Sequence, residues 1–250
     1  MRRSHLSLRV LPLLVIAIGF TPRPAAAVGG INLSWDDCGA AGASDKLSTC
    51  LSNIGVNIMV GSFTPPAEMP QFSGMSAVLD LTTDTDPMVA WWNLQPGGCR
   101  VGSVSSVFDF VSDISCFDVW AGAADGGMDY SNPVPYGYGS APITNHAKIR
   151  IVCAIPGVAP VLADGTEYYL FKVRVTNANT TGAGNCAGCP NKACIVFNQL
   201  LMTQRLGAGD YLLSAAISSA RITWQGDSPA SCNAVPARNR TWGQVKSLYR

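Results

Sequence analysis

Residues 147–155 read AKIRIVCAI, and apolar side chains occupy every second position of this stretch. A period of two is the pattern of a half-buried β-strand, because successive side chains point to opposite faces of a sheet. The inward face is predicted to carry Ile149, Ile151, Cys153 and Ile155. Residues 167–176, EYYLFKVRVT, repeat the pattern. Here the predicted inward residues are Tyr169, Phe171, Val173 and Val175, and the outward ones are Lys172, Arg174 and Thr176.

Turn signals separate these two strands. Pro156-Gly157 and Asp164-Gly165 lie between them, and such dipeptides mark tight turns. We therefore expect the two strands to pair through a short connection. Further strands are predicted at residues 56–63, 75–81, 104–110, 194–202 and 220–224. This spacing, in a chain with 25 glycines and 16 prolines, predicts a mainly β fold built as an antiparallel β-sandwich.

The N-terminus has the composition of a secretory signal peptide, which we place at residues 1–27. Three arginines precede an apolar run at residues 10–20, and alanines at 25–27 supply a cleavage site. The run is too short for a membrane span, which needs roughly 20 apolar residues. Residues 28–250 then form a single domain that is secreted, extracellular or periplasmic, with no transmembrane segment after cleavage.

The mature chain is mildly acidic. The full sequence has 17 Lys and Arg against 16 Asp and Glu, and four arginines leave with the signal peptide, so the net charge becomes 13 minus 16, or −3. Nucleic-acid binding needs clustered positive charge to neutralise phosphates, and the sequence has no run of Lys or Arg. We therefore expect no nucleic-acid partner.

Two segments depart from the strand pattern. Residues 121–145 have no period and are rich in glycine, proline and serine, which predicts a long surface loop, either a binding loop or a plain insertion. At the C-terminus, Thr241 and Gln244 fit a capping box. The apolar residues that would share one helical face there are Trp242, Val245, Leu248 and Tyr249. This predicts a short C-terminal helix, which is either a structural flap or a sorting tail.

All nine cysteines follow the predicted cleavage site, so the chain meets an oxidising compartment and a disulfide-stapled domain is expected. An odd number leaves one thiol free, and Cys153 is the expected one because it lies on the apolar face of its strand. Sequence proximity suggests Cys38 with Cys50 and Cys99 with Cys116. The predicted disulfide cysteines are Cys38, Cys50, Cys99, Cys116, Cys186, Cys189, Cys194 and Cys232.

The stretch GNCAGCPNKAC at residues 184–194 leaves three interpretations of the last four of these cysteines. They form two disulfides, or a zinc site of four thiolates, for which the Cys186-x2-Cys189 spacing is suitable. Redox catalysis would need the first thiolate at a helix N-terminus, and the glycines before it and Pro190 after it disfavour one. Structural disulfides are the favoured interpretation, with Cys186, Cys189, Cys194 and Cys232 as the alternative zinc ligands.

Catalytic chemistry has little support in the sequence. His146 is the only histidine after the cleavage site, and no G-x-S-x-G motif occurs, so no catalytic constellation is recognisable and we expect a protein that is not an enzyme. A hydrolase with an aspartate pair or a metal is the alternative. Loop carboxylates that could bind calcium, the one cofactor considered, are Asp80, Asp84 and Asp86. A second carboxylate group comprises Asp125 and Asp129.

Aromatic residues are the candidate ligand contacts. An exposed indole beside polar loop residues can stack on a sugar ring or anchor a protein partner. The candidates are Trp91, Trp92, Tyr130, Tyr136 and Tyr138, and for the two tryptophans core packing is the favoured interpretation.

Two resemblances follow from these stretches. The order of SFTPP (62–66), FSGMSAVLDL (72–81), KIRIVCAI and EYYLFKVRV is similar to the strand order of cohesins and related carbohydrate-binding sandwiches, cohesin-like or jelly-roll-like in fold. The high cysteine content departs from cohesins, so no cohesin site residue carries over. SWDDCGAAG (34–42) and the C-terminal T-W-G-x-x-K-x-x-Y-R pattern also resemble a family of uncharacterised secreted bacterial proteins, which implies no activity.

The sequence thus predicts a secreted, non-catalytic binding or cell-surface module whose ligand is a glycan or an extracellular protein. The alternative is a structural subunit of an extracellular assembly.

Overall fold

The computed structural model describes residues 30–132, 134–135, 142–157, 160–205, 207–214, 220–226 and 232. The predicted signal peptide and C-terminal helix lie outside these residues. The strands are β1 (Gly30–Trp35), β2 (Asp45–Lys46), β3 (Val56–Thr64), β4 (Phe72–Thr83), β5 (Val104–Val107), β6 (Asp125–Ser131), β7 (Val134–Pro135), β8 (Pro142–Ile143), β9 (His146–Ala154), β10 (Tyr168–Thr176), β11 (Ala193–Gln204), β12 (Tyr211–Ser214) and β13 (Arg221–Trp224). Two short 3₁₀ turns complete the described elements, η1 (Gly39–Ala41) and η2 (Ala90–Trp92).

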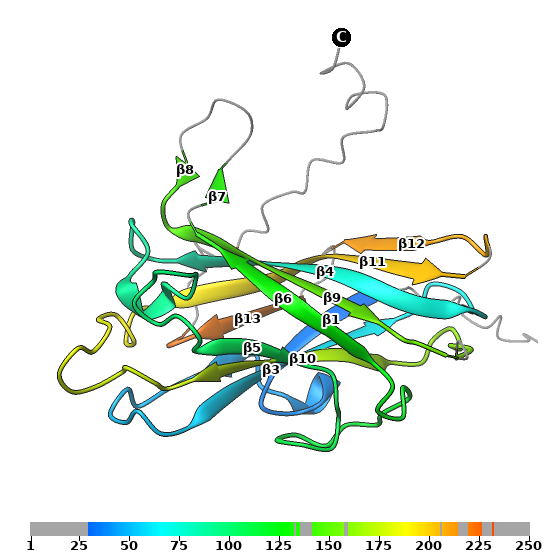
Figure 1. The fold of residues 1–250 in the computed structure, drawn as a ribbon, viewed down its shortest axis with the longest axis horizontal. Coiled ribbons are helices and arrows are strands. Elements are labelled where there is room, and N and C mark those ends of the chain that lie inside the picture. Colours follow the sequence, from blue (N-terminus) through cyan, green and yellow to red (C-terminus); the bar gives the residue numbers. More distant parts are fainter. Residues whose placement is uncertain are drawn as a thin grey trace, which may run out of the picture.

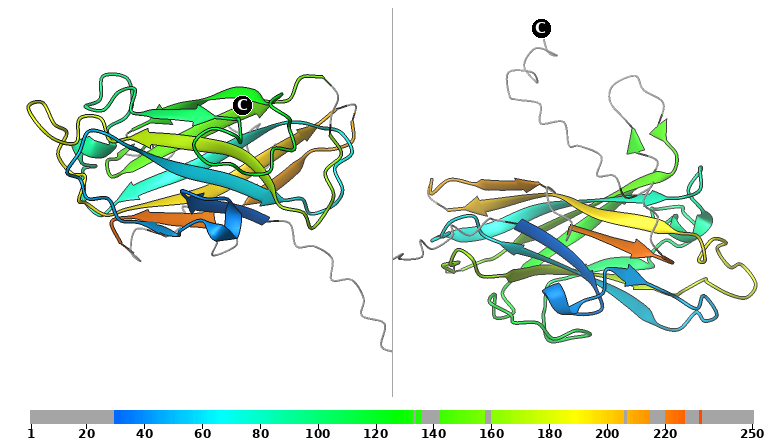
Figure 2. Two further views of the ribbon diagram at one scale, coloured as in Figure 1. Left: turned by 90° about the horizontal axis from the view of Figure 1, so that it is seen from below. Right: turned by 180° about the vertical axis from the view of Figure 1, so that it is seen from behind.

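The strands form two main sheets, and the mainly β prediction is confirmed (Figure 1). The small sheet has the order β1-β3-β10-β5. The large sheet has the order β2-β13-β11-β4-β9-β6, with β12 also paired to β11. Neighbouring strands are antiparallel except β2 and β13, which are parallel. Figure 2 shows the two sheets stacked as layers, and β7 and β8 form a separate hairpin.

The hydrophobic core lies between the two sheets. Phe171 of β10 meets Phe197 of β11 with ring centroids 5.5 Å apart, and Phe63 of β3 meets Phe72 of β4 at 6.1 Å. The alternation predicted for residues 147–155 is confirmed, since the odd-numbered residues are buried and the even-numbered ones from Arg150 onward are exposed. Burial of one face of each sheet is the main stabilising contribution of this arrangement.

The expected pairing of strands 147–155 and 167–176 is wrong. β9 lies between β4 and β6 in the large sheet, whereas β10 lies between β3 and β5 in the small sheet. The connection between β9 and β10 therefore crosses from one layer to the other. The turn dipeptides shape this crossing, and local turn chemistry alone does not select which strands become neighbours.

Strand β10 also departs from strict alternation. A register shift between Tyr169 and Phe171 places Tyr168 and Leu170 among the buried residues. Lys172, predicted outward, is fully buried, because the loop after β5 covers it. Its ammonium donates hydrogen bonds to the carbonyl oxygens of Ser112 and Ile114. Burial lowers the pKa of Lys172 from its ordinary value, and nearby Asp109 opposes that shift.

Residues 121–145 are not a loop throughout. Strand β6 occupies Asp125–Ser131 and pairs with β9 along seven positions. Its sequence, DGGMDYS, lacks alternating apolar residues, because an edge strand with several exposed side chains does not require them. Gly126 is needed here, since a Cβ at that position would lie 2.0 Å from the carbonyl oxygen of Val152.

Four disulfides join residues distant in sequence, so the eight predicted cysteines are oxidised and Cys153 is free and buried. The predicted pairs Cys38–Cys50 and Cys99–Cys116 are wrong. The observed pairs are Cys38–Cys116, Cys50–Cys189, Cys99–Cys186 and Cys194–Cys232. Proximity along the chain fails because the strands between two cysteines carry each of them to a different part of the fold. Four disulfides indicate an oxidising environment, extracellular or periplasmic.

Among the described residues, no helix has the length and hydropathy that crossing a membrane requires.

Candidate functional site

The two tryptophans proposed as ligand contacts are core residues. Trp91 and Trp92 are fully buried in η2 and pack with Trp224 of β13. The Trp91 and Trp224 rings stack at 4.8 Å, and the Trp92 ring meets both edge-on. The 3₁₀ turn sends both indoles into the core, whereas an extended segment would have sent one outward. Core packing, the favoured interpretation of these two tryptophans, is therefore confirmed, and the binding role considered for them is wrong.

A buried arginine completes this aromatic cluster. The Arg100 guanidinium lies 3.7 Å from the centre of the Trp91 ring and donates hydrogen bonds to three carbonyl oxygens, those of Trp91, Thr176 and Ala178. Burial lowers the pKa of Arg100 to about 10. These contacts fix η2 against the end of β10, so the group serves packing rather than ligand contact.

Tyr130 is a core residue as well. It lies on β6, is buried, and donates its hydroxyl hydrogen to the carbonyl oxygen of Trp92. Burial raises its pKa above the ordinary value. Its predicted role as a ligand contact is therefore wrong. The other two candidates, Tyr136 and Tyr138, lie outside the described residues.

The proposed zinc site is also wrong. The four candidate thiolates are consumed in three disulfides, Cys50–Cys189, Cys99–Cys186 and Cys194–Cys232. An oxidised sulfur cannot supply a thiolate ligand. The three cysteines in residues 184–194 therefore form disulfides with three separate parts of the chain. Cys186 and Cys189 are not bonded to each other.

The candidate calcium residues do not converge on one point. Asp80 is buried on β4, where its carboxylate accepts a 2.6 Å hydrogen bond from the Asn198 amide. Asp86 lies beyond the end of the strand and accepts a hydrogen bond from Thr144. No group of three or more His, Cys, Asp or Glu side chains suited to a metal is found within the described ranges.

Asp80 and His146 do come together in a polar cluster on the outer face of the large sheet. Lys148 lies 3.8 Å from the second Asp80 oxygen, and His146 Nδ1 lies 3.3 Å from the Thr82 hydroxyl. Burial raises the pKa of Asp80 and lowers that of His146. Such opposed shifts suit acid–base chemistry in principle. Here, however, Asp80 is buried and already bonded to Asn198, so a substrate has little access to its carboxylate.

Asp125 and Asp129 are both exposed on edge strand β6, four residues or roughly 13 Å apart along the strand, which is farther than the carboxyl pair of a glycosidase requires. They carry no geometry of a hydrolase, in which two carboxyl groups flank the scissile bond.

An exposed aliphatic loop is the feature that sequence reasoning missed. In residues 47–54, LSTCLSNI, the side chains of Leu47, Leu51 and Ile54 are 74, 82 and 86 % exposed. Single exposed aliphatic side chains are common, whereas a contiguous group of them marks an interaction surface. We name residues 47–54 the aliphatic loop.

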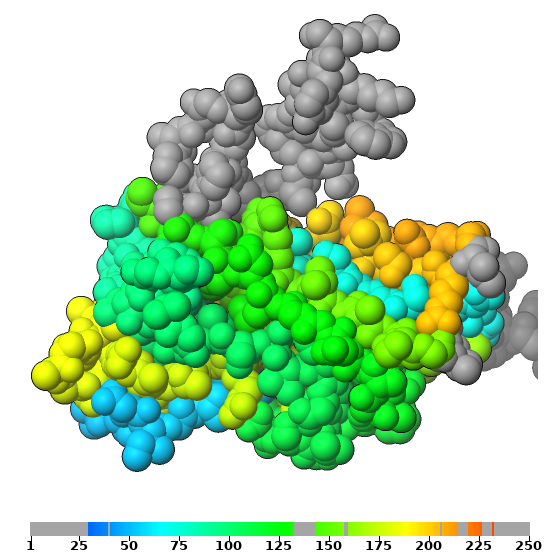
Figure 3. Space-filling view, in the orientation of Figure 1, coloured from blue at the N-terminus to red at the C-terminus, as the bar shows by residue number. Residues whose placement is uncertain are grey.

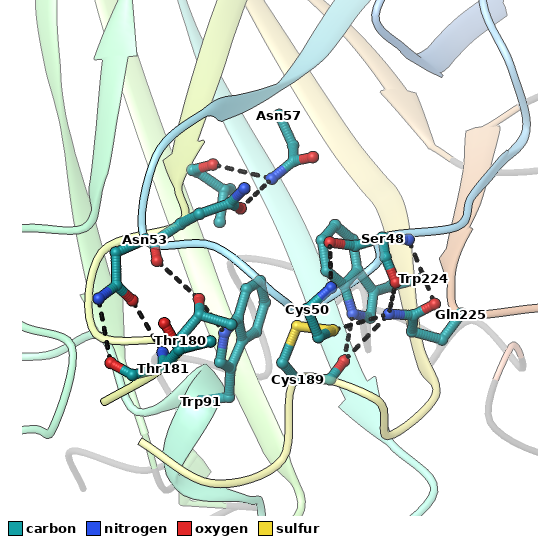
Figure 4. Close-up of a disulfide and its surroundings, with 12 residues drawn as sticks. Ser48, Cys50, Asn53, Asn57, Trp91, Thr180, Thr181, Cys189, Trp224 and Gln225 are labelled. Atoms are coloured by element: carbon teal, nitrogen blue, oxygen red, sulfur yellow. Dashed lines mark hydrogen bonds between the residues drawn. A yellow bond between two sulfur atoms is a disulfide. The ribbon is translucent and has the colours of Figure 1, made fainter. Parts of the chain in front are cut away.

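The aliphatic loop is held firmly at its middle and first half (Figure 4). The Cys50–Cys189 disulfide anchors its centre to the loop before β11. The Gln225 side-chain amide donates to the Ser48 carbonyl oxygen at 2.8 Å and accepts from the Ser48 N–H at 3.2 Å. The same amide nitrogen also donates to the carbonyl oxygen of Cys189. The side chain of Gln225 therefore bonds both backbone groups of Ser48, as the backbone of a neighbouring strand would.

The second half of the loop is held in the same manner. The Asn53 amide donates to the Thr181 carbonyl oxygen at 3.0 Å and accepts from the Thr181 N–H at 2.8 Å, as Figure 4 shows. Asn177 donates its amide hydrogen to the carbonyl oxygen of Ile54, and its N–H to that of Gly55. The backbone is thus fixed while the aliphatic side chains face solvent.

The spacing of the apolar residues in this loop is a feature of the sequence that its overall composition does not show. Leu47, Leu51 and Ile54 are spaced four and three apart, which on a helix would form one apolar face. No helix forms, because Cys50 adopts a positive φ of 54° and is tied to Cys189. An isolated apolar set in a segment rich in serine, threonine and asparagine, next to a bonded cysteine, is the pattern to look for.

Comparison with protein-family models, with curated proteins and with solved structures finds no match to this chain.

Proposed function

We propose that this protein is a secreted, non-catalytic binding module that contacts an extracellular protein through the aliphatic loop. One observation carries this proposal: three aliphatic side chains that are largely exposed stand on a backbone fixed by a disulfide and by the Gln225 and Asn53 amides. A fixed backbone favours binding because little conformational entropy is lost when the partner docks.

A protein ligand fits this loop better than a glycan. Sugar rings are recognised by stacking on aromatic faces, and the loop offers aliphatic side chains instead. The aromatic residues first considered for stacking, Trp91, Trp92 and Tyr130, are buried. Leu and Ile side chains lose unfavourable contact with water when they enter an apolar depression of a partner protein.

The fold and the location belong to the same proposal. We take the two facing sheets to be a β-sandwich, supported by ring contacts between layers such as Phe171 with Phe197. The cohesin-like or jelly-roll-like type remains a prediction from the sequence. Secretion behind a cleaved signal peptide is supported by the four disulfides, which persist in oxidising compartments.

The test compares binding of labelled mature protein to washed source cells and to their secreted protein fraction. A variant with Leu47→Ser, Leu51→Ser and Ile54→Ser is expected to lose at least tenfold in affinity. The matched control replaces Val101, Val111 and Val161 with serine, since these aliphatic side chains are also 58 to 79 % exposed but lie outside the loop. Equal binding by both variants would refute the role of the loop, and retained binding to deproteinised glycans alone would refute a protein ligand.

A further inference from the structure

The outer face of the large sheet carries an aliphatic strip at one end. Leu212 of β12 lies opposite Leu201 of β11, Leu201 lies opposite Ser76 of β4, and Ser76 lies opposite Val152 of β9. Residues directly opposite in a sheet share a face, so these four side chains form one row across four strands.

The row faces outward, because the flanking residues of each strand enter the core. Leu200 and Met202 are buried on either side of Leu201, and Ile151 is fully buried beside Val152. By contrast, Val152, Leu201 and Leu212 are 54, 36 and 50 % exposed. Half-buried Val78 lies one row further along. We name Val78, Val152, Leu201 and Leu212 the aliphatic strip; β11 and β12 are seen at the surface in Figure 3.

The outer face is covered unevenly. Towards the other end of the same strands, Asp80, Thr82, Val196 and Asn198 are all buried although they alternate with core residues. The Cys194–Cys232 disulfide is at that end, with Cys194 opposite Thr82. It fixes Cys232 to the outer face of β11, so the chain after residue 232 starts from this face.

The length of the following chain matches the distance to the strip. Cys194 and Leu201 are seven residues apart on β11, or roughly 23 Å at the rise of an extended strand. Eighteen residues follow Cys232, and Trp242 is ten residues beyond it. Ten residues span at most about 33 to 36 Å, so Trp242 can reach the strip. The apolar residues that follow at three- and four-residue spacing are Val245, Leu248 and Tyr249.

We propose that the aliphatic strip is the docking site of the chain's own C-terminal segment, residues 233–250, which the Cys194–Cys232 disulfide tethers to the same face. The tether makes docking intramolecular, which raises the effective concentration of the segment at the strip to the millimolar range expected for short linkers, on the order of 1 mM. A second copy of the chain would have to compete with that concentration. This interaction is separate from the aliphatic loop and does not depend on its function.

The test is photocrosslinking of the mature protein with Trp242→p-benzoylphenylalanine and its disulfides intact. The expected product is a monomer in which residue 242 is joined to a peptide containing Val152, Leu201 or Leu212. The yield is expected to fall at least fivefold with Leu201→Glu and Leu212→Glu, and to be unchanged with the matched pair Val111→Glu and Val161→Glu. Crosslinks between two chains, crosslinks to other surfaces, or no crosslink would each overturn the proposal.

A second measurement uses no strip variant, so it tests the proposal even if those variants misfold. Protein ending at residue 232 is expected to bind an apolar dye such as anilinonaphthalene sulfonate at least twice as strongly as the full mature chain, with unchanged near-ultraviolet circular dichroism. A synthetic peptide of residues 233–250, added in excess, is expected to reverse the increase. Equal dye binding by the two proteins would overturn the proposal.

Discussion

Replacing both cysteines of the Cys50–Cys189 disulfide with alanine tests how much this bond stabilises the fold. The bond joins residues 139 apart, but the other disulfides shorten the remaining path between its ends. That path runs 12 residues from Cys50 to Cys38, 17 from Cys116 to Cys99 and 3 from Cys186 to Cys189, so breaking the Cys50–Cys189 bond releases a loop of 32 residues. In the chain-entropy model, a closed loop of this length contributes about 4 kcal/mol by restricting the unfolded chain.

The assay is urea unfolding of the mature protein and the double variant without reductant, followed by tryptophan fluorescence. With a slope of about 2 kcal/mol per molar urea, a loss of about 4 kcal/mol lowers the midpoint by about 2 M. Fluorescence is a suitable probe because Trp91 and Trp224 are buried close to this bond, and Trp224 donates a hydrogen bond to the Cys189 carbonyl oxygen. A loss below about 1 kcal/mol would refute the loop-entropy reasoning for this bond.

Three further predictions follow from buried groups. Arg100→Met removes the donors to three carbonyl oxygens and is expected to lower the free energy of unfolding by about 2 to 4 kcal/mol, measured by thermal unfolding. Arg100→Lys keeps the charge but loses the planar fork, so it should recover no more than half of the lost stability. Recovery of wild-type stability by Arg100→Lys would contradict the role of this geometry. Burial raises the pKa of Asp80, so the folded state is favoured when Asp80 is protonated. The stability of the wild type relative to Asp80→Asn should therefore be highest below pH 3.8 and fall as the pH rises through the folded-state pKa. Unfolding curves from pH 3 to 8 that show a pH-independent difference would contradict this. Burial raises the pKa of Cys153 from 9.0 to about 11, which at pH 8 lowers the thiolate fraction about 100-fold, so iodoacetamide should modify Cys153 rapidly only after unfolding, and rapid labelling of the native protein by mass spectrometry would contradict its burial.

The alternation of buried and exposed side chains along one strand is a local property, and the sequence predicted it correctly for β9. The core face of β9, with Ile149, Ile151 and Cys153, follows from a period of two that any sheet must bury on one side. The oxidation of eight cysteines and the exclusion of Cys153 were likewise predicted, from the compartment expected for the chain and from the apolar face on which Cys153 lies. None of these conclusions needs knowledge of which strands are neighbours.

Which strands and which cysteines pair is not a local property of the sequence, and these predictions were wrong. The assignment of β9 and β10 to different sheets depends on how all strands share one core. The disulfide pairs depend on that arrangement in turn, since a disulfide requires two Cα atoms within about 4.4 to 6.8 Å, whatever their separation in sequence. Cys50 and Cys189 meet this condition at 5.8 Å across 139 residues, whereas pairing by proximity would have joined Cys50 to Cys38.

The candidate site shows the same division. Residue type identified aromatic side chains as possible contacts, but the 3₁₀ turn of η2 and the stacking on Trp224 place Trp91 and Trp92 inside. The spacing of Leu47, Leu51 and Ile54 marks them as an apolar set. Their exposure, however, results from contacts of the loop backbone with Cys189, Gln225 and Thr181, which the fold brings from distant segments. The sequence by itself determined the strand faces, the oxidising environment and the free cysteine, since these depend on neighbouring residues and on the compartment. Only the tertiary structure decided the sheet order, the disulfide partners and the exposed loop, because each of them is a contact between residues far apart in the chain.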